Sequence, residues 1–268
     1  MKRFHIFLSI GIILLLILAY SLFGVFGAVW LSLIGGSLED QPFLADTLGC
    51  VLMVLFYGYI FYRGLKKGNR KEGLLKPSAK IYGAATVMAL GVGGISYCWL
   101  SFVEKALQNI PFIQQSTERF EAVGDSMGQE PYIVIFLSVV IIGPLVEELL
   151  FRGLVFREAE KIRKGLFPVF VSAVLFGLFH MEFVQVVYTM VMGFVFGLVY
   201  QMTRSFMLVW YLHILNNFMA APPPVLDNEA FASLSNFLQI ALILPAVYLV
   251  FRWIMIDRKS RRLHQEHP

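Results

Sequence analysis

Long apolar segments, separated by short polar ones, run through the whole chain. We place eight of them near residues 6–34, 43–63, 81–102, 131–152, 166–181, 184–203, 206–221 and 236–255. Most of them reach or approach the ~20 residues with which an α-helix crosses the hydrocarbon core of a bilayer. The pattern therefore predicts an all-α, polytopic membrane protein with about eight transmembrane helices.

These segments divide one membrane domain, 1–268, into three parts. Residues 1–130 hold the N-terminal spans and a mixed apolar and polar stretch at 103–130, which predicts an interfacial helix and loop. Residues 131–220 form a core that carries unusual polar residues, and 221–268 hold an outer loop, the last span and a basic tail. Within the core, Gly193 and Gly197 have the small-xxx-small spacing that favours close helix packing.

Composition excludes a soluble domain. Of the 268 residues, 58% are hydrophobic and only 15% are charged, whereas roughly a quarter of a soluble domain is charged. The two cysteines, Cys50 and Cys98, both lie in apolar segments and suggest neither a disulfide framework nor a cysteine-rich metal site. The expected surroundings are the lipid bilayer and membrane-associated peptides, with no nucleic acid as partner.

The basic residues give the orientation. With eight spans, all but two of the 22 basic residues fall on one face, the exceptions being Lys105 and Arg119. That face holds both termini and the loop with Arg70 and Lys71. The positive-inside rule then predicts that the N and C termini are cytoplasmic.

The segment "GPLVEELLFRG", residues 143–153, places two carboxylates in apolar surroundings. The side chains of neighbouring residues on a helix point about 100° apart around its axis, so Glu147 and Glu148 point in different directions. Arg152 follows Glu148 by four residues and can pair with it, which leaves Glu147 free to face a cavity. Two nearby carboxylates with separate roles are a recurring acid/base pattern. The alternative is an ion pair at the cytoplasmic rim, with Arg152 snorkelling there.

Two further segments carry polar residues at four-residue spacing. "FGLFH" puts Phe176 and His180 on one helix face, and "HILNN" does the same for His213 and Asn217. A single intramembrane histidine is more often a hydrogen-bonded packing residue, and an asparagine often joins helices. Ionisable residues within spans nevertheless mark functional sites by default, and together these groups would satisfy one another in one hydrated pocket.

Such a pocket supports the activation of water. A carboxylate takes a proton from water, a histidine shares that role, and an amide with a second histidine stabilises an oxyanion. The same groups would alternatively hold a divalent metal such as zinc, with Glu147, His180 and His213 as ligands. The H-E-x-x-H signature of helix-borne zinc sites does not occur in the sequence.

The three motifs resemble those of a known family. "EELLFRG" resembles the E-E-x-x-x-R motif of the membrane-embedded CAAX-protease and bacteriocin-processing family, the type II CAAX endopeptidases among them. "FGLFH" is similar to its F-x-x-x-H motif, and "HILNN" to its H-x-x-x-N motif. They occur in the family's order in separate apolar segments, over residues 130–220.

The resemblance implies an intramembrane endopeptidase with an all-helical core. It makes Glu147 the catalytic glutamate and Glu148 its partner, paired with Arg152. His180 would share the water with Glu147, while His213 and Asn217 would stabilise the oxyanion. Phe176 supports this set as the first residue of its motif. Members of the family are often labelled metalloproteases, yet one branch is explicable without bound metal, so the cofactor stays open.

One difficulty concerns depth in the membrane. By the segment boundaries, His180 lies near the outer end of its span and Glu147 near the inner end of its own, about 10–15 Å apart along the bilayer normal. We expect the Glu147 helix to continue past Arg152 through "FREAEKIRK", and the side chains of Glu147, His180 and His213 to converge on one cavity.

The expected function is hydrolysis of a peptide bond in a membrane-associated protein or peptide, in a bacterial-type plasma membrane, with peptide maturation or bacteriocin immunity as its setting. A non-enzymatic membrane scaffold or immunity partner is the alternative, although a scaffold needs no complete catalytic set. A proton-coupled transporter would also use intramembrane glutamate and histidine, but no inverted repeat is visible.

Overall fold

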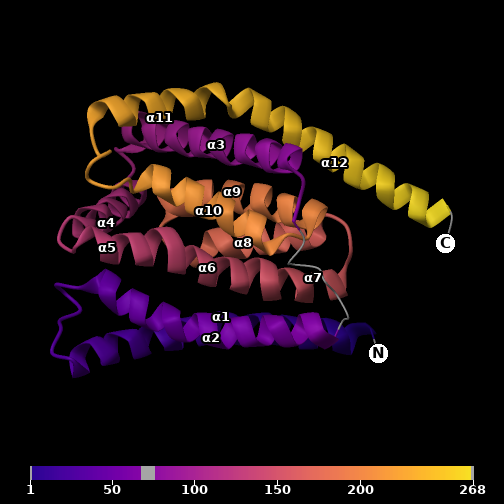
Figure 1. The fold of residues 1–268 in the computed structure, drawn as a ribbon, viewed down its shortest axis with the longest axis horizontal. Helices are drawn as coiled ribbons and strands as arrows, with labels where there is room; N and C mark the ends of the chain where they lie inside the picture. The colour runs from indigo at the N-terminus through magenta and orange to yellow at the C-terminus, as the bar shows by residue number, and fades with distance from the viewer. Residues whose placement is uncertain (1, 68–75, 267–268) are drawn as a thin grey trace.

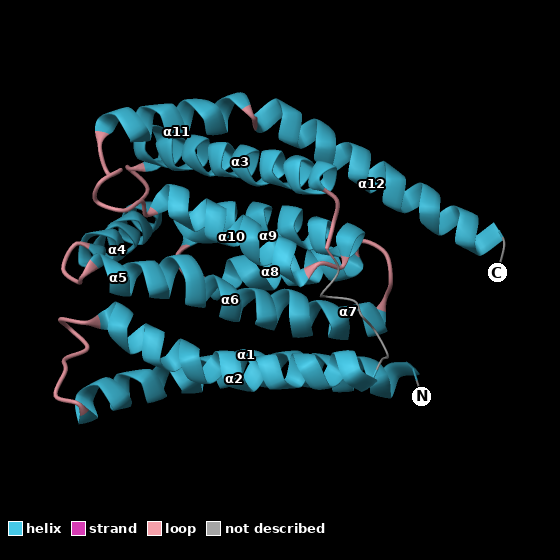
Figure 2. Ribbon diagram, viewed as in Figure 1, coloured by secondary structure: helices cyan, strands magenta, loops and turns pink. Residues whose placement is uncertain are grey.

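Helices make up nearly all of the regular structure. The computed structural model describes residues 2–67 and 76–266, and these residues contain helices and no strand (Figure 2). The all-α prediction is therefore confirmed for this part of the chain. Arg70 and Lys71, which belong to the predicted basic loop, lie outside the described residues.

The elements follow one another with short connections. In chain order they are α1 (Lys2–Leu33), α2 (Pro42–Lys67), α3 (Ala79–Phe102), the π-helix η1 (Val103–Leu107), α4 (Pro111–Met127), α5 (Tyr132–Ile135), the π-helix η2 (Phe136–Ile142), α6 (Gly143–Glu148), the π-helix η3 (Leu149–Val155), α7 (Phe156–Ile162), α8 (Phe167–Phe179), α9 (Phe183–Thr203), α10 (Phe206–Ala220), α11 (Glu229–Ala241) and α12 (Ile243–Glu266).

Every predicted apolar segment is helical, but the lengths differ. Among the described residues, five helices are long and apolar enough to cross a membrane, and the bent pair α11 and α12 gives a sixth. The apolar helices α8 and α10 are shorter, with 13 and 15 residues. The protein is thus a polytopic membrane protein, and its count of eight spans stays a prediction.

The last apolar segment differs most from its prediction. Instead of one span over 236–255, helix α11 ends at Ala241 and α12 begins at Ile243, with a 40° bend between them. Pro245 lies in the first turn of α12. A proline there cannot donate to the carbonyl four residues earlier, at Ala241, which accounts for the break in the helix.

The helices lie in layers with the polar core segment in the middle (Figure 1). Helices α1 and α2 pack together on one side, and α3 packs with α11 and α12 on the other. Between them lie the continuous run from α5 to α7 and the helices α8, α9 and α10. Helix α1 begins and α12 ends at the same end of the bundle, and the cytoplasmic location of that end remains a prediction.

Two glycines let α8 and α9 approach closely. A Cβ atom added at Gly193 would lie 3.1 Å from the Cα of Ala173, and one added at Gly197 would lie 3.4 Å from Cγ1 of Val169. The close packing predicted from the small-xxx-small pair is therefore confirmed. It brings the carbonyl of Gly193 within reach of the buried charges described below.

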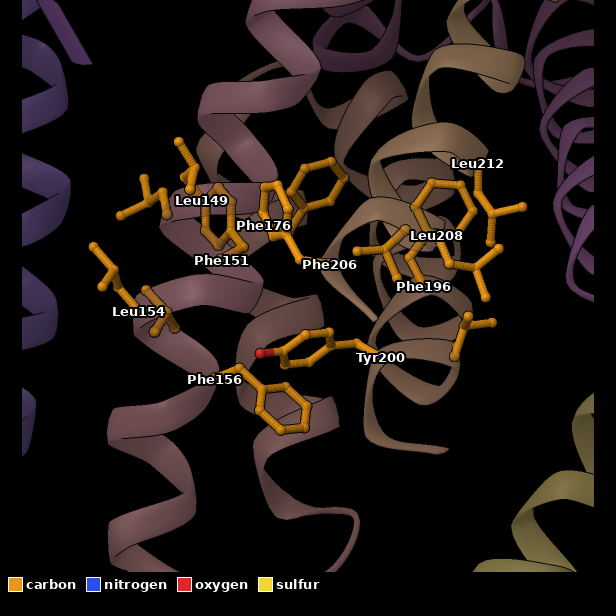
Figure 3. Close-up of a cluster of buried hydrophobic side chains, with 14 of the residues drawn as sticks. Leu149, Phe151, Leu154, Phe156, Phe176, Phe196, Tyr200, Phe206, Leu208 and Leu212 are labelled. Carbon is orange, nitrogen blue, oxygen red and sulfur yellow. The ribbon is translucent and has the colours of Figure 1, made fainter. Parts of the chain in front are cut away.

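The apolar core surrounds the polar segment and fixes its helices. Figure 3 shows side chains from η3, α7, α8, α9 and α10 meeting in one cluster, among them Phe151, Phe176 and Phe196. The rings of Phe151 and Phe176 meet edge to face at 5.2 Å, as do those of Phe156 and Tyr200. Such aromatic pairs have preferred angles, so they limit rotation of the helices that carry the motifs.

The predicted helix within 103–130 is present as α4. It packs against the N-terminal part of α9, where the hydroxyl of Ser116 accepts a hydrogen bond from the backbone N–H of Val184 at 3.2 Å. Arg119 forms an ion pair of 2.7 Å with Glu182, in the loop between α8 and α9. Helix α4 thus lies beside the loop that follows His180, and its place at a membrane surface stays a prediction.

Candidate active site

The two glutamates lie on a short α-helix between two π-helical segments. Glu147 and Glu148 belong to α6, with η2 before it and η3 after it, within one continuous span from Tyr132 to Ile162. The expected continuation of this helix past Arg152 is therefore confirmed. π-Helical turns are rare and frequent at functional sites.

The π-helical segments expose backbone carbonyls that neighbouring side chains cap. A π-helical turn disrupts the i→i+4 pattern of an α-helix, so some carbonyls need other partners. In η2, the carbonyl of Val139 accepts from the Asn217 amide at 2.8 Å and that of Ile141 from the Trp210 indole at 3.1 Å. In η3, the carbonyl of Phe151 accepts from the Ser172 hydroxyl at 3.1 Å. Helices α8 and α10 are thereby fixed against the glutamate helix.

Glu148 is held by Arg152. The Nε atom of Arg152 lies 3.3 Å from Oε2 of Glu148, and both side chains are 0% exposed. Arg152 also donates from Nη2 to the carbonyl of Gly193 at 3.2 Å, and its guanidinium lies 4.8 Å from the centre of the Phe176 ring. The structure thus contains the pair expected from the four-residue spacing, deep in the bundle rather than at the rim.

His213 lies between the two glutamates. Its Nδ1 is 2.9 Å from Oε1 of Glu148, and its Nε2 is 3.5 Å from Oε2 of Glu147. Its ring also contacts Phe176 and Phe196, with centroid distances of 5.7 and 5.8 Å. Sequence spacing did not predict this double contact, which links the two carboxylates through one imidazole.

Glu147, His180, His213 and Asn217 line one cavity of about 430 Å³. The side chain of Glu147 keeps 14% exposure, whereas that of Glu148 has none. Nε2 of His180 is buried and has no hydrogen-bond partner among the described residues. The structure therefore brings together the residues of all three motifs and leaves Glu147 and His180 with unused polar atoms beside the cavity.

The depth difficulty disappears because the helix that carries Glu147 continues past Arg152 to Ile162, as expected. The chain passes from the end of α7 at Ile162 into α8 at Phe167 and returns antiparallel to the glutamate helix. At ~1.5 Å per residue, Glu147 lies about 22 Å before Ile162, and His180 lies about 20 Å after Phe167. The two residues consequently reach a similar level from the same end of the bundle.

A metal does not fit this arrangement. Among the described residues, no group of three or more histidine, cysteine, aspartate or glutamate side chains is placed to hold a metal ion. Nδ1 of His213 faces Glu148 and its Nε2 faces Glu147. We therefore derive no step through a metal.

Sequence reasoning missed one acidic residue near the site. Asp46 on α2 accepts a hydrogen bond of 2.6 Å from the Ser138 hydroxyl of η2, and the thiol of Cys50 lies 3.7 Å from the same carboxylate. An aspartate within the apolar segment 43–63 was the available signal. Asp46 ties α2 to the π-helical segment that precedes the glutamates.

Residues 129–219 match the family model described as type II CAAX prenyl endopeptidase, Rce1-like. This range contains all three motifs and every predicted site residue. The resemblance inferred from the motifs is therefore confirmed for this segment.

Two curated bacterial proteins are similar to the same part of the chain. YdiL of Bacillus subtilis (strain 168), by its name a candidate membrane peptidase, is 28% identical over 105 residues, 39% of this chain and 42% of YdiL. The membrane-embedded CAAX protease MroQ of Staphylococcus aureus (strain USA300) is 32% identical over 106 residues, 37% of this chain and 42% of MroQ. The chain thus spans less than half the length of either relative in these alignments, and no solved structure matches it.

Proposed function

We propose that this protein is an intramembrane endopeptidase that hydrolyses a peptide bond in a membrane-associated peptide or protein. The observation that carries the proposal is the division of roles between the glutamates. Glu148 is occupied by Arg152 and His213, while Glu147 lines the cavity together with His180. The similarity to membrane peptidases supports the same reaction class.

In this mechanism Glu147 is the general base. Its carboxylate takes one proton from a water in the cavity, and the water oxygen bonds to the carbon of the scissile carbonyl. The carbonyl π electrons move to its oxygen, giving a tetrahedral oxyanion. The C–N bond then breaks, and Glu147 returns the proton to the leaving amine. His180, whose Nε2 has no partner among the described residues, shares the water or donates to the oxyanion.

His213 and Asn217 take supporting roles in this proposal. The contacts of His213 with both carboxylates favour a residue that orients Glu147, rather than the oxyanion donor expected from the motif. Asn217 donates to the carbonyl of Val139 through Nδ2. A side-chain amide carries two N–H groups, so its second one remains available to the oxyanion.

The substrate class is supported by the membrane-spanning helices that line the cavity. In this proposal, a membrane-embedded peptide or a membrane-associated protein reaches it from the bilayer. The maturation of a small secreted peptide, or immunity to one, would use such an activity.

Cleavage of defined membrane peptides tests the proposal. The purified protein is placed in lipid nanodiscs with fluorescence-quenched peptides, each a leucine and alanine helix followed by a short uncharged segment. Products are identified by mass spectrometry. We expect Glu147→Gln and His180→Ala to lower kcat by roughly 10³-fold and 10²-fold, as for loss of a general base and of one oxyanion donor.

Glu158→Gln is the matched control, because Glu158 lies on the same continuous span, near its end, and contacts Ser9 and Lys161. It should cleave as the wild type does. Equal processing by wild type, Glu147→Gln and His180→Ala would reject the assignment. Cleavage that survives thorough chelation supports water activated by Glu147.

A further inference from the structure

The cavity that contains Glu147 also has a wall of neutral amides. Asn216 of α10 and Asn236 and Gln239 of α11 line it together with Gly93 of α3. Gly93, Asn236 and Gln239 lie outside residues 129–219, the segment that matches the family model, whereas Asn216 lies within it. We refer to Gly93, Asn216, Asn236 and Gln239 as the amide wall.

Gly93 makes the amide wall possible. A Cβ atom added at Gly93 would lie 1.9 Å from Oε1 of Gln239 and 3.6 Å from Oδ1 of Asn216. Two side-chain carbonyl oxygens thus lie close to the backbone of one glycine, where a side chain would clash with the nearer one. Neighbouring Gly94 also allows α11 to approach closely, since its added Cβ would lie 2.3 Å from the backbone carbonyl oxygen of Gln239. The two glycines of α3 therefore let α11 approach closely enough to line the cavity.

Much of the hydrogen-bonding capacity of the amide wall is unused. Gln239 is only 9% exposed and donates from Nε2 to the Ser235 hydroxyl at 2.8 Å. The side-chain amides of Asn216 and Asn236 have no hydrogen-bond partner among the described residues. In the described part of the chain, no lysine or arginine lines this cavity. The wall consequently offers donors and acceptors without a positive charge.

An extended peptide within a membrane needs such groups. Its backbone N–H and C=O groups have no partners within their own segment, and each unsatisfied group costs several kcal/mol in an apolar medium. A side-chain amide supplies both a donor and an acceptor, which matches the alternation of N–H and C=O along a strand. A negatively charged substrate group would meet Glu147 here, with no lysine or arginine on the described lining.

We propose that the amide wall binds the substrate backbone in an extended conformation, over an uncharged segment next to the scissile bond. This rests on the proposed function, since the wall shares its cavity with Glu147 and His180. The substrate would then be a membrane peptide whose cleaved segment is uncharged and unwound. This segment would lie away from a free C-terminal carboxylate.

Binding to an inactive variant tests the amide wall without requiring turnover. Glu147→Gln protein in nanodiscs is titrated with three labelled leucine and alanine membrane peptides. The first has an uncharged segment with normal amides, the second has one backbone N–H of that segment replaced by an ester oxygen, and the third has one aspartate in it. Fluorescence anisotropy gives the affinities.

With the wall intact, the ester peptide should bind roughly three- to tenfold more weakly than the amide peptide, the value of one hydrogen bond. The aspartate peptide should also bind more weakly, because no lysine or arginine on the described lining compensates for the desolvation of its carboxylate. Adding Asn236→Leu, a change of similar size, should reduce the difference between amide and ester peptides to less than twofold. Gln239→Met provides a second variant with the same expectation, should the first lower expression.

Leu238→Ala is the control on α11, because Leu238 is 44% exposed and does not line the cavity. It should keep the full preference for the amide peptide. Equal binding of amide and ester peptides to the intact wall would overturn the proposal, as would an unchanged preference in Asn236→Leu and Gln239→Met. If the intact wall binds the amide peptide more tightly than the ester peptide but the wild type cleaves no peptide, the proposed function is rejected. The proposed binding by the amide wall is then retained.

Discussion

At the scale of single residues, the site is a row of ionisable side chains in contact, and Glu147 at one end keeps 14% exposure. Arg152 contacts Glu148, Glu148 contacts His213, and His213 contacts Glu147. Buried charges are tolerated when they are paired, and removing one partner leaves the other uncompensated. We therefore expect stability and the proposed chemistry to depend on different members of the row.

Arg152→Met should destabilise the protein by about 3–5 kcal/mol, because it leaves the carboxylate of Glu148 buried without its guanidinium. The free energy of unfolding in mild detergent, measured by denaturant titration, checks this value. The double variant Arg152→Met with Glu148→Gln should recover part of the loss, since neither charge then remains. A double variant as unstable as the sum of the single variants would contradict this pairing.

Glu147→Gln and Glu148→Gln should have opposite effects. Glu147 has no direct ion pair with Arg152 in the structure, so its amide variant should stay within about 1 kcal/mol of wild-type stability while losing cleavage. Glu148→Gln leaves the buried guanidinium of Arg152 without its carboxylate partner and should lower stability by about 3 kcal/mol. Thermal unfolding and peptide cleavage, measured on the same preparations, separate the two. A strongly destabilised Glu147→Gln would argue against its separate role.

The residue scale also shows where sequence reasoning succeeded. The Glu148–Arg152 pair follows directly from four-residue spacing on a helix. The double contact of His213 does not, because it depends on how α10 is rotated against α6. That rotation is fixed by Asn217 and Trp210 on carbonyls of η2, and a π-helical segment has no clear signature in an apolar run.

At the scale of helices, glycines decide which surfaces meet. On α3, a Cβ atom added at Gly91 would lie 2.3 Å from Cβ of Ala246 and 2.6 Å from the carbonyl of Leu242, whereas one at Gly83 meets nothing within 4 Å. The two positions lie on the same helix and differ only in what approaches them. Helix α3 thus packs closely against the bend between α11 and α12.

Gly91→Ala should therefore destabilise the protein by roughly 1–3 kcal/mol through overpacking. Gly83→Ala is its control and should be neutral or stabilising by up to about 1 kcal/mol, since alanine favours a helix. Denaturation midpoints of both variants in detergent check the contrast. Equal losses at the two positions would mean that α11 and α12 do not pack on α3 as described.

The link between α4 and the loop after His180 should depend on pH. The hydrogen bond from Arg119 holds the pKa of Glu182 below its ordinary value of 4.5. A lowered pKa means that the pair stabilises the fold above the ordinary value, and that this contribution is lost as pH falls through the lowered pKa. A spin label at Gly124→Cys, in a Cys98→Ser background, should become more mobile below about pH 4.5.

Glu182→Gln should remove this pH dependence and leave α4 equally mobile at all pH values. Label mobility that responds to acid in the Glu182→Gln variant would assign the effect to another group.

At the scale of the whole molecule, the charge bias and the helix layout agree. The loops at 34–41 and 221–228 lie at the end of the bundle opposite to the start of α1 and the end of α12, whereas the turn at 163–166 lies at the same end as those termini. The predicted topology puts the first two outside the cell and the third inside.

Single cysteines in a Cys98→Ser background test this topology. Glu39→Cys and Asp227→Cys should react with a membrane-impermeant maleimide in intact cells, and Lys164→Cys should react only after permeabilisation. Labelling of Lys164→Cys in intact cells would invert the topology.

The whole fold was largely predictable as a set of helices, because apolar length alone marks a span. The bend at Leu242 was not placed, since it depends on a local break in a long apolar run. The continuation of the Glu147 helix to Ile162, which was expected, is what brings Glu147 level with His180. The amide wall was also missed, since Asn236 and Gln239 reach the cavity only through the glycine face of α3.

The π-helical segments around Glu147 have an evolutionary consequence. A π-helical turn holds one residue more than an α-helical turn, and each residue advances an α-helix by about 100°. Loss of one codon within η2 would straighten the span and turn both glutamates by about that angle relative to α5. The helix would still cross the bilayer, but Glu147 would leave the cavity. A single mutational event would thus remove the activity proposed above and retain the membrane fold.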